Sequence, residues 1–258
     1  AHLIAKTLGT NMRTTSGPAI ERVGDLAAIL TNLSPGDVLF IDEIHRLSKS
    51  IEEVLYPAME SGVLDIIIGK GPSARTVQLE LPPFTMVAAT TRISLLSSPL
   101  RSRFSGGTFR LEFYTDEEIA QILKRSAELL AVEVSNEVLR DIARRCRATP
   151  RTANYLLKRC RDLAQLEGTA ASGEIVTRTF ELLEIDELGL NAPDRAVLET
   201  IISKFNGGPV GLNTIAAATG EKQSTIEDVV EPYLIRQGLL ERTPRGRIAS
   251  AAAYNHLQ

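Results

Sequence analysis

The stretch Val38-Leu39-Phe40-Ile41-Asp42-Glu43 decides the fold of this chain, because four apolar residues run directly into two adjacent carboxylates. The turn residues Pro35-Gly36-Asp37 come just before it. A short apolar run bounded by turn residues is typical of a strand that is buried in a parallel sheet. Because open α/β sheets bind ligands beyond the carboxyl ends of their strands, Asp42 and Glu43 are expected at a ligand-binding edge.

Two adjacent carboxylates at such an edge suit nucleotide hydrolysis. The first can help to hold Mg²⁺ on the nucleotide, through water, and the second can polarise the water that attacks the γ-phosphate. This is the Walker-B arrangement of an ATPase, and it predicts Asp42 as the metal partner and Glu43 as the base. The alternative is a core strand that ends in a solvated acidic turn. It is the weaker interpretation, because later residues complete a nucleotide site.

A P-loop ATPase also needs the motif G-x-x-x-x-G-K-[ST], whose backbone N–H groups and lysine cradle the phosphates. The motif does not occur in these 258 residues. Residues 1–9 instead have the pattern of the helix that follows such a loop, with Leu3, Ile4 and Leu8 on one face and Gly9 as its cap. We therefore expect a chain that begins after the P-loop and, as given, binds ATP poorly.

Composition is that of an ordinary globular protein, at 43% hydrophobic and 24% charged residues. No apolar run approaches the length of a membrane span and no signal peptide is visible, so we expect a cytoplasmic protein without a membrane partner. Cys146 and Cys160 match no metal-binding spacing and are expected to be free thiols in a reducing compartment. The net charge of −3 creates no strong field, so any contact with DNA must come from local clusters.

The pattern along the chain predicts three domains, at residues 1–112, 113–186 and 187–258. The first alternates strands (11–15, 38–43, 85–89) with helices (19–33, 50–59), as a parallel sheet requires. Two β-rich runs, 64–68 and 76–81, flank Gly69-Lys70-Gly71-Pro72 and predict a hairpin with a basic tip.

The second domain has a wholly helical pattern. Its first helix is expected to start at Thr115, with Glu118 completing a capping box. In the third domain, helices at 193–205, 214–219 and 224–237 precede a strand, a basic turn and a second strand between residues 238 and 249. This order of elements predicts a winged helix.

A polar strand end and two arginines extend the nucleotide site. Thr91, with Thr90, ends the strand expected beside the Walker-B strand, where a hydroxyl can sense the γ-phosphate. Arg101 and Arg103 follow soon after. An arginine supplied across a subunit boundary stabilises the transition state of phosphoryl transfer and accelerates the step roughly 10³–10⁵-fold. A lone arginine is more often part of a surface ion pair, but this order of motifs is that of an AAA+ ATPase.

Motifs that carry a family resemblance are spread over nearly the whole chain. They are Ser16-Gly17-Pro18-Ala19-Ile20-Glu21, residues 37–47, Tyr56-Pro57-Ala58-Met59-Glu60, Pro99-Leu100-Arg101-Ser102-Arg103-Phe104, Leu111-Glu112-Phe113-Tyr114, Gly207-Gly208-Pro209-Val210-Gly211-Leu212 and Arg242-Thr243-Pro244-Arg245-Gly246-Arg247. Together they closely resemble the RuvB family of Holliday-junction branch-migration motors. The resemblance implies an α/β AAA+ core with a parallel sheet, a small helical lid and a C-terminal winged helix. It also implies a homo-hexameric ring that uses ATP and Mg²⁺, releases ADP, pumps duplex DNA and is loaded by a RuvA-like junction-binding protein.

The resemblance further implies roles for single residues. The catalytic set would be Asp42, Glu43, Thr91 and Arg103, as metal partner, base, sensor and arginine finger. Residues that contact or lie near the nucleotide would be Glu60, Ser61, Gly62, Arg101, Arg103, Tyr114 and Arg151. The hairpin 64–81 would dock the RuvA-like protein, and the DNA contacts of the wing would come from Arg242, Arg245 and Arg247.

Besides the missing P-loop, two departures from the family pattern stand out. The stretch 105–110 is rich in Gly, which can alter how Arg103 is presented, and Ala148 stands where Gly is expected. The chain is interpreted as an ATP-driven motor subunit that moves DNA in recombination and repair. The alternative from another class is a non-catalytic DNA-binding or assembly module, against which Asp42, Glu43 and Arg103 argue. A clamp-loader-like subunit is a further alternative, which the winged-helix pattern disfavours.

Overall fold

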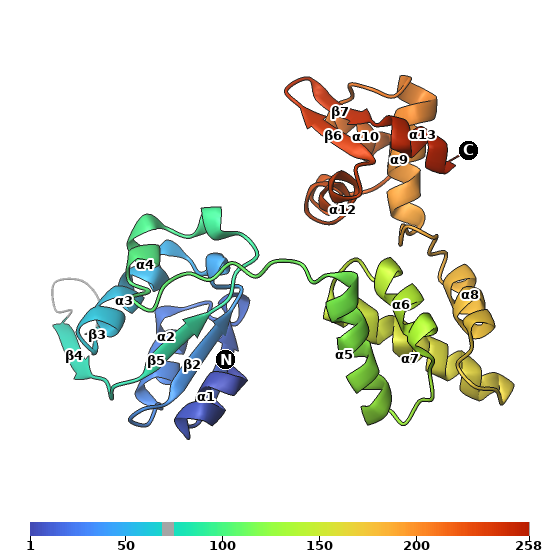
Figure 1. Ribbon diagram of the computed structural model, residues 1–258. Helices are drawn as coiled ribbons and strands as arrows, with labels where there is room; N and C mark the ends of the chain where they lie inside the picture. The colour runs from blue at the N-terminus through green and yellow to red at the C-terminus, as the bar shows by residue number, and fades with distance from the viewer. Residues whose placement is uncertain (69–74, 258) are drawn as a thin grey trace. The chain divides into compact units, whose positions relative to one another are not determined.

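The computed structural model describes residues 1–68 and 75–257, and it divides into two compact units, Ala1–Arg110 and Leu111–Gln258 (Figure 1). The second unit contains both segments that the sequence predicts as a helical domain and a winged helix. These two segments keep separate hydrophobic cores, so they are not joined by one shared apolar core.

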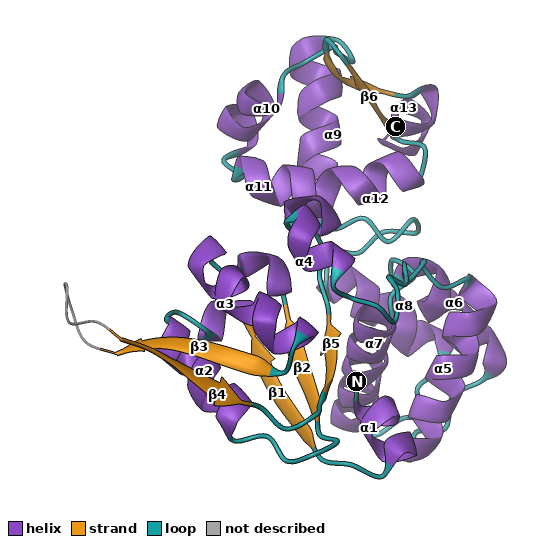
Figure 2. Ribbon diagram, turned by 90° about the vertical axis from the view of Figure 1, so that its left-hand side faces the viewer, coloured by secondary structure: helices purple, strands orange, loops and turns teal. Residues whose placement is uncertain are grey.

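The first unit is built on a three-stranded parallel sheet in the order β1-β2-β5, which confirms the predicted parallel core (Figure 2). The strands are β1 (Met12–Ser16), β2 (Val38–Asp42) and β5 (Thr85–Ala88). β2 lies in the middle, and Val38, Leu39 and Ile41 are completely buried. Because β2 is flanked by a strand on each side, its polar residues reach solvent only where the strand ends.

The described part of the first unit also contains helical segments. They are α1 (His2–Leu8), η1 (Gly17–Ala19), α2 (Val23–Thr31), η2 (Ile44–Arg46), α3 (Lys49–Glu60), η4 (Ile93–Leu95) and α4 (Ser98–Ser102). Leu30 of α2 and Leu55 of α3 share one core with Leu39 and Ile41 of β2. The core helices therefore bury their apolar faces on the strand that carries the two carboxylates.

The helix α1 forms as predicted and is capped by Gly9, whose φ of 68° is a left-handed value that glycine adopts without strain. Its expected apolar face is exposed, however, since Leu3, Ile4 and Leu8 all lie open to solvent and only Ala5 is buried. The spacing of the apolar residues predicts a helix, but it does not predict whether another part of the protein covers the apolar side of that helix.

A β-hairpin extends from this unit, as predicted, and consists of β3 (Val63–Ile68) and β4 (Arg75–Glu80) in an antiparallel register from Val63↔Glu80 to Ile68↔Arg75 (Figure 2). Leu64 is buried, and Leu79 packs against the same core. The predicted basic tip, Gly69-Lys70-Gly71-Pro72, lies outside the described residues.

The second unit begins with four helices, α5 (Asp116–Leu129), α6 (Asn136–Arg145), α7 (Pro150–Glu167) and α8 (Gly173–Leu182). The capping box is confirmed: the Thr115 N–H donates to Glu118 Oε2 at 2.8 Å, and the Glu118 N–H donates to Thr115 Oγ1 at 3.2 Å. Cys146 and Cys160 are free and buried, and burial raises the pKa of the Cys160 thiol to about 11. Across the described residues, no helix combines the length and the apolar character that a membrane span requires.

The winged-helix segment follows with α9 (Ala192–Phe205), α10 (Leu212–Thr219), α11 (Gln223–Thr225), η5 (Ile226–Val230), α12 (Glu231–Arg236), β6 (Leu240–Thr243), β7 (Gly246–Ala249) and α13 (Ala251–Leu257). The predicted helix 224–237 is thus divided, because η5 is a π-helix directly ahead of Pro232. Proline has no N–H to donate and its ring crowds the preceding turn, so the helix widens there. The final helix α13 was not predicted.

Candidate functional site

The carboxyl end of β2 forms a tight turn that presents both predicted carboxylates. Asp42 is the last residue of β2, and Glu43 adopts a left-handed φ of 49° before η2 begins. The Glu43 N–H donates to Asp42 Oδ1 at 3.0 Å. Gly17, at the end of β1, approaches this turn so closely that a Cβ there would lie 2.3 Å from the Glu43 carbonyl oxygen. Non-glycine residues in this conformation cluster at functional sites, which agrees with a chemical role for Glu43.

Two side chains contact the Glu43 carboxylate, those of Thr91 and His45. Thr91 Oγ1 donates to Glu43 Oε2 at 3.4 Å, so the predicted base and the predicted sensor do lie together. His45 was not predicted, yet its Nδ1 is 3.3 Å from Glu43 Oε2 and 2.9 Å from Thr90 Oγ1. Its position two residues beyond Glu43, on the turn between β2 and α3, is the signal that could have identified it.

The predicted finger, Arg103, is held in place by several groups of the first unit. It follows α4, and its Nη1 donates to the Pro99 carbonyl at 2.7 Å. Its Nη2 lies 3.1 Å from Glu60 Oε1, and its guanidinium lies 4.4 Å from the ring centroid of Tyr56. Arg103 and Glu60 were both predicted as site residues, and the structure pairs them. Arg101, by contrast, is exposed on α4.

A buried carboxylate joins the two helices that carry these groups. Glu52 of α3 is only 5% exposed and accepts hydrogen bonds from Ser97 Oγ at 2.5 Å and Tyr56 Oη at 3.1 Å. Ser97 also caps α4, because its Oγ accepts the Leu100 N–H at 3.2 Å. The network fixes α4 on α3 and thereby sets the position from which Arg103 projects. Sequence reasoning missed Glu52, since an acidic residue on a helix is most often solvated.

The remaining predicted nucleotide residues lie on two parts of the chain. Ser61 caps the end of α3, and Gly62 has a φ of 65° ahead of β3. Tyr114 and Arg151 belong to the second unit, where Tyr114 is 45% exposed and Arg151 is exposed in the first turn of α7. Their side chains are therefore accessible to a ligand.

The donor set at the edge of β2 fits a magnesium ion that arrives with its nucleotide. Within the described residues, no group of three or more His, Cys, Asp or Glu side chains is placed to hold a metal. Asp42 offers one exposed carboxylate. Mg²⁺ usually keeps several waters and is bound by one or two carboxylates together with substrate phosphates, so a single carboxylate suffices.

The three arginines of the wing have different environments. Arg242 and Arg247 are cross-strand partners on β6 and β7, and Arg245 lies exposed in the turn between them. The Arg242 side chain is 56% exposed, 3.3 Å from the partly exposed Glu227. An exposed pair of this kind is weak, which leaves Arg242 available to another anion.

Arg247 differs from the expectation, because its guanidinium is buried inside the wing. Its Nε and Nη2 donate to the two carboxylate oxygens of Glu231 at 2.5 and 3.2 Å, and Glu231 itself is 2% exposed. Such a bidentate pair joins β7 to α12. In this structure Arg247 supports the wing, whereas a contact with DNA would require the pair to open.

Comparison with known proteins gives consistent matches along the chain. Residues 1–111 match the Holliday junction DNA helicase RuvB P-loop domain, residues 114–186 the RuvB AAA lid domain, and residues 187–258 the RuvB C-terminal winged helix domain. The solved structure of the RuvB Holliday junction branch migration motor of Thermotoga maritima is 49% identical, with a TM-score of 0.87 over 99% of this chain and 81% of the other. Two mutant forms of that protein match at 49% identity with TM-scores of 0.88, again over 99% of this chain and over 81% and 82% of theirs.

The different roles of the buried Arg247 and the exposed Arg245 can be tested by measuring stability. Replacing Arg247 with Met removes the bidentate partner of the buried Glu231 and leaves only Arg242, 3.9 Å away, so we expect the free energy of unfolding to fall by about 3–5 kcal/mol. Arg245→Met, on the exposed turn, should change it by less than about 0.5 kcal/mol. Urea unfolding followed by circular dichroism measures both. Adding Glu231→Leu to Arg247→Met should recover much of the loss, and equal effects of the two single changes would contradict the assignment.

Proposed function

This chain belongs to the RuvB family of Holliday-junction branch-migration motors, and we propose from that premise which of its residues carry the ATPase and DNA-binding steps. Proteins of this family are AAA+ ATPases that drive branch migration. The proposal rests above all on one observation, the hydrogen bond between Thr91 and the Glu43 carboxylate at the carboxyl end of β2.

Glu43 acts as the general base of ATP hydrolysis. Its carboxylate is partly exposed beyond the buried strand, where it can take a proton from an attacking water. Thr91 and His45 restrict its orientation, and the Thr91 hydroxyl is placed to sense the γ-phosphate. Asp42 would hold Mg²⁺ through water, and the ion supplies charge neutralisation on the phosphates when it is bound with the nucleotide.

Arg103 acts as an arginine finger for the site of a neighbouring subunit in a homo-hexameric ring. Its guanidinium is already oriented by Glu60 and the Tyr56 ring, so little side-chain freedom is lost when it meets a phosphate. Arg101 lies exposed beside it. Tyr114 and Arg151 are proposed to contact the nucleotide, and Ser61 and Gly62 to lie near a bound nucleotide. We further propose a cytoplasmic location, which the DNA-processing role of the family supports.

Mixing two inactive variants tests the base and the finger together. In a version of the protein that carries a phosphate-binding loop ahead of Ala1, Glu43→Gln should bind ATP normally and abolish turnover, because an amide cannot act as a base. Arg103→Ala should also abolish turnover. Mixed rings contain some interfaces with an intact base and an intact finger, so mixing should restore part of the activity.

Turnover that survives Glu43→Gln would remove Glu43 from its role as the base. Absence of turnover in the unsubstituted protein would favour a non-catalytic module. Loss in both variants without recovery at any mixing ratio, in rings shown to contain both, would mean that Arg103 does not act across the interface. Arg103→Lys should rescue little, because lysine lacks the planar fork of donors.

The β3–β4 hairpin is proposed to dock a RuvA-like junction-binding protein. Its strand β4 is largely exposed, and Val77 presents an apolar side chain that is 38% accessible. Val77→Asp should weaken binding of that partner at least about tenfold, because a charge at a buried contact is poorly solvated. Thr76→Asp adds the same charge on the other face of the strand and serves as the control in the same titration. Equal weakening by both changes would count against this surface.

The wing is proposed to hold duplex DNA by its phosphates, mainly through Arg242 and Arg245. Each neutralised phosphate contributes a slope of about −0.9 to log K against log salt, so Arg242→Ala combined with Arg245→Ala should flatten the slope by roughly 2. The loss should be equal on unrelated duplexes, because phosphates carry no sequence information. Anisotropy titrations at several salt concentrations measure both quantities. Arg178→Ala, an exposed arginine of the lid paired with Glu167, is the control, and an unchanged slope in the double variant would refute the phosphate contacts.

A further inference from the structure

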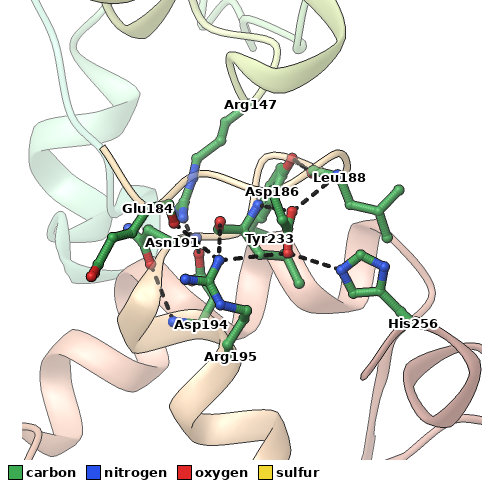
Figure 3. A network of polar contacts seen from close by, with 10 residues as sticks. Arg147, Glu184, Asp186, Leu188, Asn191, Asp194, Arg195, Tyr233 and His256 are labelled. Carbon is green, nitrogen blue, oxygen red and sulfur yellow. Dashed lines mark hydrogen bonds and ion pairs between the residues drawn. The ribbon is translucent and has the colours of Figure 1, made fainter. Parts of the chain in front are cut away.

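A polar cluster, rather than a shared apolar core, joins the lid segment to the winged helix within the second unit (Figure 3). We call this cluster the clasp. It consists of Phe113 and Arg147 from the lid side and Asp194, Tyr233 and Arg236 from the winged helix, and Figure 3 labels Arg147, Asp194 and Tyr233 among them. The proposed chemistry uses none of these residues, and only Phe113 belongs to a family motif, Leu111-Glu112-Phe113-Tyr114. Their arrangement therefore calls for a separate explanation.

The first element of the clasp is a buried ion pair between Arg147 and Asp194. The Asp194 side chain is completely buried, and it also accepts the Asn191 N–H at 2.9 Å as part of the capping box of α9. Burial raises the pKa of the Asp194 carboxyl, while the Asn191 N–H and the Arg147 guanidinium lower it. An ion pair without solvent costs a large desolvation energy, so removing one partner is strongly unfavourable.

The second element is the aromatic ring of Tyr233, which contacts two guanidinium groups. Arg147 lies 4.6 Å from the ring centroid and Arg236 lies 5.3 Å from it. Arg236 also lies 4.5 Å from the ring of Phe113. Cation–π contacts of this kind are stronger when they are desolvated, and Tyr233 is only 6% exposed. The ring thereby contacts the lid at Arg147, and Arg236 of the winged helix reaches a second lid position at Phe113.

The third element is a close approach of the two segments at Gly189. A Cβ at this position would lie 2.7 Å from the Arg145 carbonyl oxygen, on the lid, and 2.8 Å from Tyr233 Oη, on the winged helix. The φ of Gly189 is +74°, which other residues adopt only with strain. Both the space and the backbone conformation therefore require glycine, and the connection leaves little freedom for relative motion.

The lid end of the clasp has an unusual backbone conformation. Arg147 and Ala148 are consecutive non-glycine residues in the left-handed region, with φ values of 59° and 53°. Each such residue costs of the order of 1 kcal/mol or more and persists only where surrounding contacts hold it. The turn leads directly into Pro150 and Arg151, the start of α7. The strained turn thus lies between the buried ion pair and a proposed nucleotide contact.

Both lid members of the clasp adjoin proposed nucleotide contacts, since Phe113 precedes Tyr114 and Arg147 lies four residues before Arg151. We propose that Arg147 is a positioning residue that couples the nucleotide contacts of the lid to the DNA-binding winged helix, with Tyr233 as its support. The clasp makes the winged helix and the Arg147–Arg151 turn move together, so each ligand changes the affinity of the protein for the other. This inference rests on the proposed roles of Tyr114 and Arg151.

Coupling of this kind has a reciprocal, measurable size. A ligand that shifts the affinity for a second ligand is itself shifted by the same factor, which is typically about 5–150-fold. In the version of the protein with a phosphate-binding loop ahead of Ala1, the Kd for a fluorescein-labelled duplex is measured without nucleotide and with saturating ADP. The Kd for ADP is then measured with and without the duplex. We expect both ratios to differ from one by the same factor, at least about fivefold.

The decisive variant is Arg147→Met, which keeps the length of the side chain and removes the guanidinium. We expect both coupling ratios to fall below about twofold, while the nucleotide-free Kd for DNA and the DNA-free Kd for ADP stay within about twofold of wild type. Arg159→Met is the matched control, because Arg159 also pairs with an aspartate, Asp162, and lies 5.6 Å from the ring of Tyr155, all on α7 alone. It should keep the full coupling.

Full coupling in Arg147→Met, or a wild-type ratio below about twofold, would overturn the inference. Failure of the wild type to bind ADP or DNA at all would instead contradict the proposed function. If circular dichroism shows that Arg147→Met does not fold, Arg147→Lys decides, because it keeps a positive charge beside Asp194 and removes the planar guanidinium from the Tyr233 ring. Loss of coupling in Arg147→Lys supports the clasp, and full coupling refutes it.

Discussion

Burial of β2 in the middle of a parallel sheet is the constraint on which the rest of the first unit depends. Val38, Leu39 and Ile41 lie in the core, so the chain cannot leave the sheet until the strand ends. The two carboxylates come at that point, and the left-handed turn at Glu43 directs the chain away over Gly17. The site is therefore rigid because its acidic residues are attached to the most completely buried strand of the sheet.

Three buried carboxylates hold the other elements in register. Glu52 joins α3 to the start of α4 through hydroxyl groups, and Glu231 joins α12 to β7 through Arg247. Asp194 joins α9 to the turn before α7 through Arg147. In each case a charge without water requires a particular partner, so the pair fixes one relative placement where apolar contacts would tolerate several. The same device serves the contact of α3 with α4, the wing, and the contact between the lid and the winged helix.

The sequence predicted the elements of the fold because their signals are local. The apolar run into Asp42, the Thr115 capping box and the order of helices before the wing all depend on neighbours in the chain. The sequence did not predict contacts between residues that are far apart in the chain. The burial of Glu52 and Arg247 does not follow from spacing, because Ser97 and Glu231 lie 45 and 16 residues away, and neither does the contact of His45 with Thr90, 45 residues away.

The same limit applies to surfaces and to helix ends. The period of α1 predicts a helix, yet its apolar face is open. The start of α13 was missed although Ser250 precedes it and its Oγ accepts the Ala253 N–H at 3.3 Å, because a lone serine before three alanines is a weak signal. Family resemblance supplied the roles of Thr91 and Arg103, which spacing alone would have left as ordinary polar residues. The structure adds what motifs omit, namely the side chains that hold those residues in position.

The burial of both thiols has a practical consequence for experiments that follow domain movements of this protein. Cys146 and Cys160 are buried, and burial raises the pKa of both, to about 11 for Cys160. Thiol-directed reagents attack the thiolate, so near neutral pH they react slowly with both native side chains. A single cysteine introduced at an exposed position would thus be the preferred point of attachment for a dye or a surface tether. Domain movements could then be followed in individual molecules without first removing the natural cysteines.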